Sequence, residues 1–416
     1  MKPWILFAAV ALSSVAPGVC QYPTPAARLR YVVILTRHGV RSPTWTVERL
    51  NRYSSLPWPE WGVPAGNLTA HGRSAMNIMG SYYRALFSSQ GLLGQPACKD
   101  ATRTFWWADQ DQRTVESAKA LAEGMLPACA VEIHAAPRGE KDPMFSAPDP
   151  TGGDPQLALA AVKERIGPDM NALVERHRAA FEQLAALLNG NGKAPASIVD
   201  QPVSLGAGKG GVSMDGPLAL ASTLAEDFLL EYTNGMQGDQ LAWGRLNASN
   251  LQQIMELHTA YAELMRRTPA LARRRASNLL TRIVKSLQQA ADGKPTEGAM
   301  GLPGDAMLVI SGHDTNISNL SGMLGLSWHV TSYQPDDSPP GGALVFSLWQ
   351  LPASGYSVRV QFVTQTLDQM RYLSPLSLKN GPAVADLFVE GCSTSAEGYP
   401  CDWAKFLRVA SDAVTP

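Results

Sequence analysis

The sequence predicts a layered α/β domain with a central mixed sheet and an inserted all-helical subdomain. Two apolar runs, residues 31–35 and 306–310, have the composition and length of buried strands. Strand and helix patterns alternate up to residue 153, whereas the patterns from 154 to 267 are helical. The chain of 416 residues also exceeds the size at which one hydrophobic core usually stops growing, which favours two subdomains.

The α/β domain is assigned to residues 21–153 and 268–416. In the first stretch the apolar spacing predicts four elements: a strand at 31–36, a helix at 74–87, a strand at 104–108 and a helix at 114–125. In the second stretch, the strand at 306–310 leads into an amphipathic helix at 317–324. Such alternation is typical of helices packed on a sheet.

The helical subdomain is assigned to residues 154–267. Apolar residues recur there at helical spacing, which predicts helices at 156–166, 170–188, 217–232 and 251–267. The stretch 189–211 is rich in Gly, Pro, Ala and Ser, so we expect it to be a surface loop.

The N-terminus, residues 1–20, has the features of a secretory signal. Lys2 precedes a short apolar stretch at 4–12, and small residues follow up to Cys20. The alternative is an N-terminal structural helix, but Pro17 and Gly18 would break it. We therefore expect a periplasmic or secreted protein, with no stable membrane association after the signal is removed.

The cysteine count agrees with export. Removal of the signal leaves four cysteines, Cys98, Cys129, Cys392 and Cys401, an even number that permits complete pairing. Four cysteines allow three pairings, and four free thiols are the alternative. Their spacing does not match a zinc site.

The overall charge argues against nucleic-acid binding. The formal net charge is −1, and 273–275 is the one run of basic residues. Affinity for an anion must therefore come from a local pocket. We expect a monomer that binds a small molecule and needs no metal or other cofactor.

The first candidate motif, Arg37-His38-Gly39-Val40-Arg41, follows the strand at 31–36. A neutral histidine is a nitrogen nucleophile, and two guanidinium groups beside it suit a tetrahedral oxyanion such as phosphate. A structural histidine is the alternative. However, burying three potential cations together is unfavourable unless an anion compensates them.

The second candidate motif, His313-Asp314-Thr315-Asn316, follows the strand at 306–310. Asp, Thr and Asn before a helix are also common N-terminal caps, so each could have a purely structural role. Together, however, the two motifs supply a nucleophile, cations for phosphate and a proton donor.

These motifs resemble those of the histidine acid phosphatases, and the Asp-Thr-Asn sequence is most similar to their bacterial phytase branch. The resemblance extends over residues 30–403 and implies a fold like that of phosphoglycerate mutase. It also implies that Cys98 pairs with Cys129 and Cys392 with Cys401. Without the resemblance, Arg113 would be a solvated arginine at a helix start, whereas the family has a phosphate-binding arginine there.

The resemblance implies a two-step mechanism. His38 attacks phosphorus and forms a phosphohistidine, Asp314 protonates the leaving alcohol, and the phosphate is held by Arg37, Arg41, Arg113 and His313. Because Asp314 must start protonated and His38 unprotonated, we expect an acidic optimum.

Two further residues are predicted to contact the substrate. Thr44 stands beside the first motif, and Arg275 matches a position that lines the pocket in the phytase branch, although it could simply solubilise its helix.

The substrate itself is left open. The branch favours phytate, but Trp45 stands where many phytases have a lysine. A sugar-phosphate phosphatase such as a glucose-1-phosphatase is therefore an alternative. A second alternative, of a different class, is a non-catalytic protein that binds phosphorylated ligands. The cytosolic mutases of the superfamily are disfavoured by the signal and the cysteines.

Overall fold

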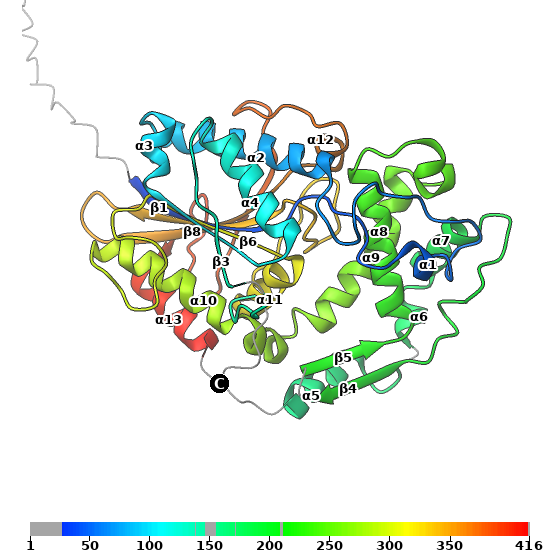
Figure 1. Ribbon diagram of the computed structural model, residues 1–416. Coiled ribbons are helices and arrows are strands. Elements are labelled where there is room, and N and C mark those ends of the chain that lie inside the picture. The colour runs from blue at the N-terminus through cyan, green and yellow to red at the C-terminus, as the bar shows by residue number, and fades with distance from the viewer. Residues whose placement is uncertain (1–26, 138, 146–154, 171, 209–210, 415–416) are drawn as a thin grey trace, which may run out of the picture.

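The computed structural model describes residues 27–137, 139–145, 155–170, 172–208 and 211–414. A mixed sheet with the strand order β10-β8-β7-β1-β6-β2-β3 forms the centre of one half, and β9 pairs with β8 (Figure 1). The strands are β1 (Arg28–Arg37), β2 (Thr104–Ala108), β3 (His134–Ala135), β6 (Met307–Gly312), β7 (Ala343–Gln350), β8 (Tyr356–Thr364), β9 (Ala383–Leu387) and β10 (Cys401–Asp402).

The parallel part of the sheet determines where the motifs meet. Strands β1 and β2 both run parallel to β6, and Arg37 lies opposite Gly312 in this register. The carboxyl ends of the three strands therefore lie at one edge of the sheet. His38, Asp109 and His313, the residues that follow these ends, emerge side by side.

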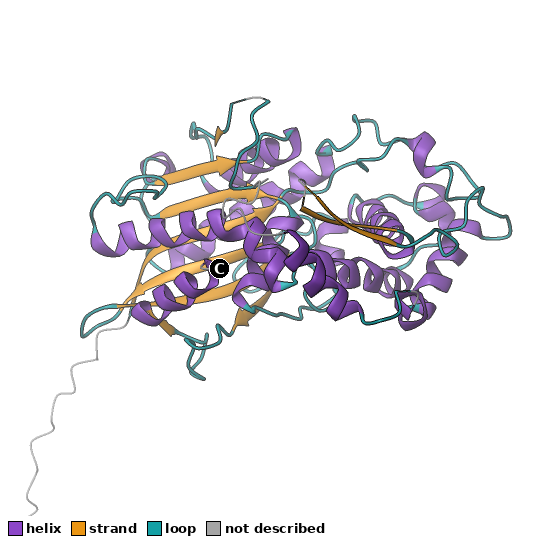
Figure 2. Cartoon of the chain, turned by 90° about the horizontal axis from the view of Figure 1, so that it is seen from below, coloured by secondary structure: helices purple, strands orange, loops and turns teal. Residues whose placement is uncertain are grey.

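The two faces of the sheet are covered by different helices. Val32 and Ile34 pack in a core with α2 (Ala70–Ser89) and α4 (Gln112–Met125). The alternate residues Val33 and Leu35 face the opposite core. Its helices are α10 (Pro269–Asp292), α11 (Asp314–Leu324) and α13 (Trp403–Val414), which lie across the sheet in Figure 2.

The second half of the molecule is mainly helical and shares the core of the α10 face. Its principal helices are α5 (Pro155–Ile166), α6 (Ala172–Arg176), α7 (Arg178–Asn189), α8 (Pro217–Thr233) and α9 (Ala248–Met265). Short elements connect the larger ones: α1 (Val47–Leu50), α3 (Ala97–Ala101), η1 (Gly238–Gln240), η2 (Ala242–Gly244) and α12 (Leu367–Arg371).

Two local predictions for this half are wrong. The helix expected at 170–188 is broken at His177, whose backbone angles are not helical. The stretch expected to be loop, and the residues after it, contain a hairpin of β4 (Ser204–Gly208) and β5 (Gly211–Asp215). Val212 and Met214 of β5 are buried, a two-residue alternation that the surrounding glycines and polar residues obscure.

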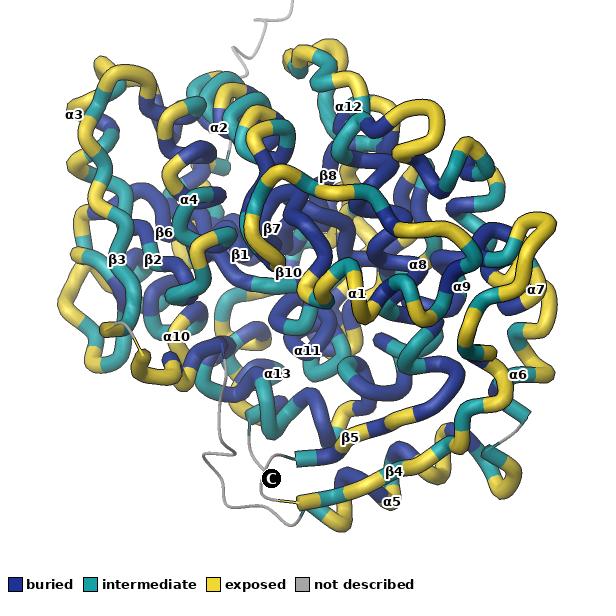
Figure 3. The backbone as a smooth tube through the Cα atoms, turned by 45° about the vertical axis from the view of Figure 1, so that its right-hand side comes forward, coloured by how far each residue is buried: buried dark blue, intermediate teal, exposed yellow. Residues whose placement is uncertain are grey.

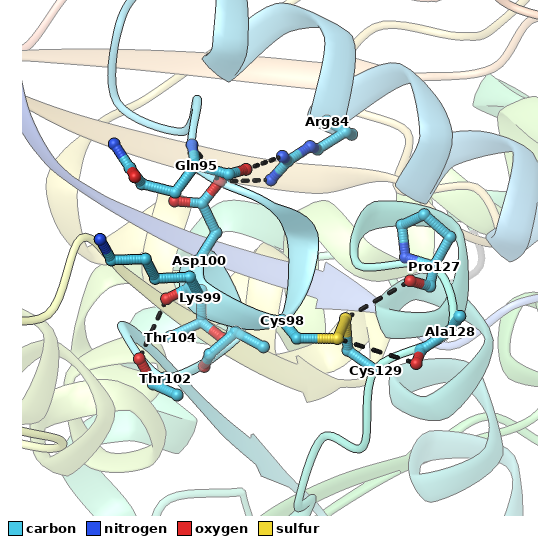
Figure 4. The surroundings of a disulfide bond; sticks show 11 residues. Arg84, Gln95, Cys98, Lys99, Asp100, Thr102, Thr104, Pro127, Ala128 and Cys129 are labelled. Atoms are coloured by element: carbon cyan, nitrogen blue, oxygen red, sulfur yellow. Dashed lines mark hydrogen bonds and ion pairs between the residues drawn. A yellow bond between two sulfur atoms is a disulfide. The ribbon is translucent and has the colours of Figure 1, made fainter.

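Both disulfide pairings implied by the resemblance are confirmed. Cys98 is bonded to Cys129, which ties α3 to the segment after α4 (Figure 4), and Cys392 is bonded to Cys401. The alternative of four free thiols is therefore wrong.

The predicted signal, residues 1–20, lies outside the described residues. Among the helices that the structure describes, none has the length and apolarity needed to cross a bilayer. In Figure 3 the central strands form the buried interior, whereas much of β4 and α5 is exposed.

Candidate active site

His38 is held at the end of β1 with one ring nitrogen committed to the backbone. Its backbone N–H donates to the carbonyl of Gly312 (2.9 Å), and its Nδ1 lies 2.8 Å from the carbonyl oxygen of Gly39. A carbonyl can only accept, so Nδ1 carries the proton and donates it. The other nitrogen, Nε2, therefore has a free lone pair when the ring is neutral.

The surroundings of His38 keep the ring neutral. The residue is only 2 % exposed, and burial is the main cause that lowers its pKa well below the usual value. The positive charges of Arg37, Arg113, His313 and Arg41 lower the pKa further. Nε2 can thus act as a nucleophile even in acid.

Arg37 and Arg41 are connected by a buried carboxylate that the sequence analysis missed. Glu226 of α8 pairs with Nη2 of Arg37 through one oxygen and with Nη2 of Arg41 through the other, the latter at 3.0 Å. Arg37 also donates to the carbonyl of Ser338 (2.6 Å). Although burial opposes ionisation, Arg41 and Arg37 lower the pKa of Glu226 to about 2. A signal was available, since Glu226, Asp227 and Glu231 are the charged residues of a helix that is otherwise uncharged and largely apolar.

Two side chains from other elements, His313 and Arg113, complete the group around His38. His313 is the N-cap of α11, and its ring centroid lies 5.5 Å from that of His38. Its Nε2 lies 2.6 Å from a carboxylate oxygen of Asp109, which holds the ring in place. Arg113 of α4 pairs with Asp111 at 2.5 Å. The predicted phosphate-binding residues are therefore brought together from β1, α4 and α11.

Asp314, the first residue of α11, is surrounded by groups that favour its ionised form. Its carboxylate pairs with Nη1 of Arg266, and Nε2 of His258 lies 3.8 Å away. Burial favours the neutral acid, but Arg266, Arg37 and His258 hold the pKa of Asp314 well below its usual value. The proton-donor role thus requires added negative charge in the site, which a bound phosphate supplies.

The two predicted substrate contacts lie in different places. Thr44 is exposed and lies beside Gly66. The carbonyl of Gly66 accepts a hydrogen bond from Arg113 (3.4 Å), so Thr44 lies at the edge of the group of basic side chains around His38. Arg275 donates instead to the carbonyls of Met265 (2.9 Å) and Val212 (3.1 Å). Its guanidinium is directed to these backbone groups, and Arg266 is the arginine that contacts Asp314.

A cleft of about 490 Å³ adjoins Glu226. Its lining includes His258 and Arg266, and also Trp45 and Arg49. The guanidinium carbon of Arg49 lies 3.6 Å from the centroid of the Trp45 ring, a cation–π contact. Arg49 therefore places a cation directly beside Trp45 at the cleft.

Two groups of side chains in the described part of the chain have metal-ligand spacing. They are Asp109, Asp111 and His313, and Glu226, His258 and Asp314. In each group, arginines already pair with carboxylates. A metal cation would therefore compete with guanidinium groups for the same oxygens.

Comparison with known proteins decides the family. The model of the histidine phosphatase superfamily (branch 2) matches residues 28–363. The chain belongs to this superfamily. It is 34 % identical to phytase AppA from Escherichia coli, over 94 % of this chain and 93 % of that protein. It is 28 % identical to a glucose-1-phosphatase from Providencia rettgeri, over 93 % and 92 % of the two chains.

Solved structures agree with this membership. A Hafnia alvei phytase in complex with tartrate superimposes with a TM-score of 0.86 at 35 % identity, covering 94 % of this chain and 98 % of that one. The predicted family, enzyme class and layered α/β fold of this superfamily member are thereby confirmed.

We expect Glu226→Gln to lower the free energy of unfolding by about 3 kcal/mol near pH 6, because Arg37 and Arg41 would stay charged without their shared carboxylate. Urea unfolding followed by tryptophan fluorescence measures this. A carboxylate with a lowered pKa contributes stability above its unfolded value and loses it as pH falls. The deficit should therefore shrink between about pH 4.5 and about pH 2.

The exposed Glu48→Gln on α1 is the matched control and should leave stability unchanged. A deficit that stays constant down to pH 2 would show that the charge of Glu226 does not stabilise the two arginines.

Proposed function

We propose that this protein is an exported, monomeric phosphatase that hydrolyses phosphate monoesters through a phosphohistidine on His38. The observation that carries the proposal is the unprotonated Nε2 of a buried histidine among Arg37, Arg41, Arg113 and His313. Cations of this kind neutralise the charge of a phosphoryl group, which is about −1.5 to −2 near neutral pH. A small phosphate ester is the partner, and no nucleic acid is involved.

In the first step, Nε2 of His38 attacks phosphorus while the surrounding cations hold the nonbridging oxygens. The bond between phosphorus and the ester oxygen breaks as the bond to Nε2 forms. An alkoxide is a poor leaving group, so Asp314 donates a proton to the departing oxygen. The negative charge of the bound phosphate raises the proton affinity of Asp314 and counteracts Arg266.

In the second step, water attacks the phosphohistidine. The carboxylate of Asp314, now deprotonated, accepts a proton from this water. The phosphorus–nitrogen bond breaks, phosphate leaves, and His38 returns to its neutral form. The hydrogen bond from Nδ1 to Gly39 keeps the ring oriented through both steps.

The cleft favours a substrate with several phosphate groups. Arg49 and Arg266 add two cations beyond the ones around His38. An inositol polyphosphate such as phytate fits this distribution, in line with the phytases among the relatives. A sugar phosphate such as glucose 1-phosphate is the second candidate, since glucose-1-phosphatases are also similar to the chain and Trp45 presents a flat aromatic surface.

A non-catalytic binder would need the arginines but not a free histidine nitrogen beside an aspartate. The arrangement of His38 and Asp314 is the argument against that alternative.

We expect His38→Ala to abolish formation of the phosphoenzyme, because no other group would receive the phosphoryl group. Rapid mixing with a radiolabelled phosphate ester, followed by an alkaline quench, traps acid-labile phosphohistidine. His329→Ala, at an exposed histidine, is the matched control and should leave the label unchanged. Turnover by the wild-type protein without any labelled histidine would refute the mechanism.

Hydrolysis of alkyl phosphates should be fastest in acid. The lowered pKa of His38 keeps the nucleophile unprotonated there, and Asp314 loses its proton as the pH rises. The measurement is kcat against pH at saturating glycerol 2-phosphate, because kcat reports the ionisations of the enzyme with substrate bound. A rate that climbs steadily from about pH 5 to about pH 9 would contradict these roles.

Asp314→Asn should slow poor leaving groups more than good ones. We expect kcat for an alkyl phosphate to fall by about a hundredfold or more, and kcat for 4-nitrophenyl phosphate to fall much less, because a phenolate needs little protonation. Equal losses on the two substrates would remove Asp314 from the role of proton donor.

A further inference from the structure

Arg266 is a charged residue of the site that the mechanism above does not use. It follows the last residue of α9, and its Nη1 pairs with the carboxylate of Asp314. Its side chain is 12 % exposed and lines the cleft, with its guanidinium carbon 5.8 Å from the centroid of the Tyr261 ring. One guanidinium thus both contacts the proposed proton donor and lines the cleft.

The ion pair with Arg266 opposes the proposed role of Asp314 as a proton donor. A guanidinium in contact stabilises the carboxylate and opposes its protonation, yet the first step requires the protonated acid. The charged and titratable groups that face Asp314 come from several elements: Arg266 and His258 of the α9 segment, Glu226 of α8, Arg37 of β1, Arg113 of α4, and Asp337 before β7.

Several of these groups are already engaged by the protein. Arg37 is bound by Glu226 and by the carbonyl of Ser338, and Nδ1 of His258 lies 3.2 Å from the carbonyl oxygen of Ser222. Glu226 and His258 also line the cleft, but Arg266 is the residue of the cleft that forms an arginine ion pair with Asp314. A second anion in the cleft can therefore compete with Asp314 for this guanidinium.

We propose that Arg266 determines specificity by linking an anionic group on the leaving alcohol to the protonation of Asp314. The inference rests on the proposed function. A phosphate next to the scissile ester would bind Arg266 and weaken its pair with Asp314. The freed carboxylate takes a proton from solvent and delivers it to the departing oxygen. Esters that carry a neighbouring phosphate would thus gain in kcat, and not in binding alone.

The test compares the full-length wild type with Arg266→Gln and Arg266→Lys. The substrates are myo-inositol hexakisphosphate, an inositol monophosphate and 4-nitrophenyl phosphate, with kcat and KM measured separately near pH 5. Arg408→Gln, at an exposed position on α13, is the matched loss of one arginine and should change no parameter.

For Arg266→Gln we expect KM for the hexakisphosphate to rise about tenfold, the usual effect of one lost charged hydrogen bond. We also expect kcat for the monophosphate to rise. In its pH profile, the fall of kcat on the basic side should move to higher pH, because Arg266 no longer favours the ionised form of Asp314. The ratio of the two kcat values should therefore fall. The kcat for 4-nitrophenyl phosphate should change least, because a phenolate needs little protonation, and Arg266→Lys should give intermediate values.

Equal losses of kcat on the hexakisphosphate and the monophosphate would show a structural role for Arg266 and overturn the inference. An unchanged ratio of the two kcat values, with no shift of the basic side of the pH profile, would overturn it as well. Should Arg266→Gln fail to fold, Arg266→Lys is judged by the same ratio and pH profile. A wild type that hydrolyses none of the three esters would refute the proposed function instead.

Discussion

The ion network of Arg37, Glu226 and Arg41 is the interaction on which the rest of the site depends. Two arginines at the end of a buried strand would repel each other and carry a large desolvation penalty. One carboxylate from α8 contacts both, although it lies 189 residues after Arg37 in the chain. It fixes the guanidinium groups and joins the sheet to the helical half.

This network alters the argument that buried arginines require an external anion. The protein supplies its own negative charge, because the carboxylate of Glu226 pairs with both arginines. The same pattern recurs around it, since His313 is held by Asp109, Arg113 by Asp111, and Asp314 by Arg266. A phosphate would enter a group of cations that are already oriented, which lowers the reorganisation needed on binding.

The balance of charge also bears on the two roles proposed for Asp314. Arginines around its carboxylate hold its pKa low, and the negative charge of a phosphate would raise its proton affinity. The state of this acid is thus a property of the whole site and of what the site contains. The neighbouring His38 is less sensitive, because burial is the main cause of its low pKa.

The sequence alone determined the elements and motifs that depend on neighbours in the chain. The strands of β1 and β6, the polar residues directly after them and the family could be predicted, because apolar period and strand-end chemistry are local signals. Thr104–Ala108 was predicted to the residue. The hairpin β4–β5 was not, because its alternation is short and rich in glycine.

Only the tertiary structure decided which charges meet. Glu226, Asp109 and Arg266 gave no local sign of their partners, since each pairs with a residue from a distant element. Arg266 follows the end of α9 and pairs with Asp314, whereas Arg275, a short way along the chain on α10, donates to backbone carbonyls. Ion pairs between elements depend on how helices pack, and that geometry is set by the whole core rather than by any short run of residues.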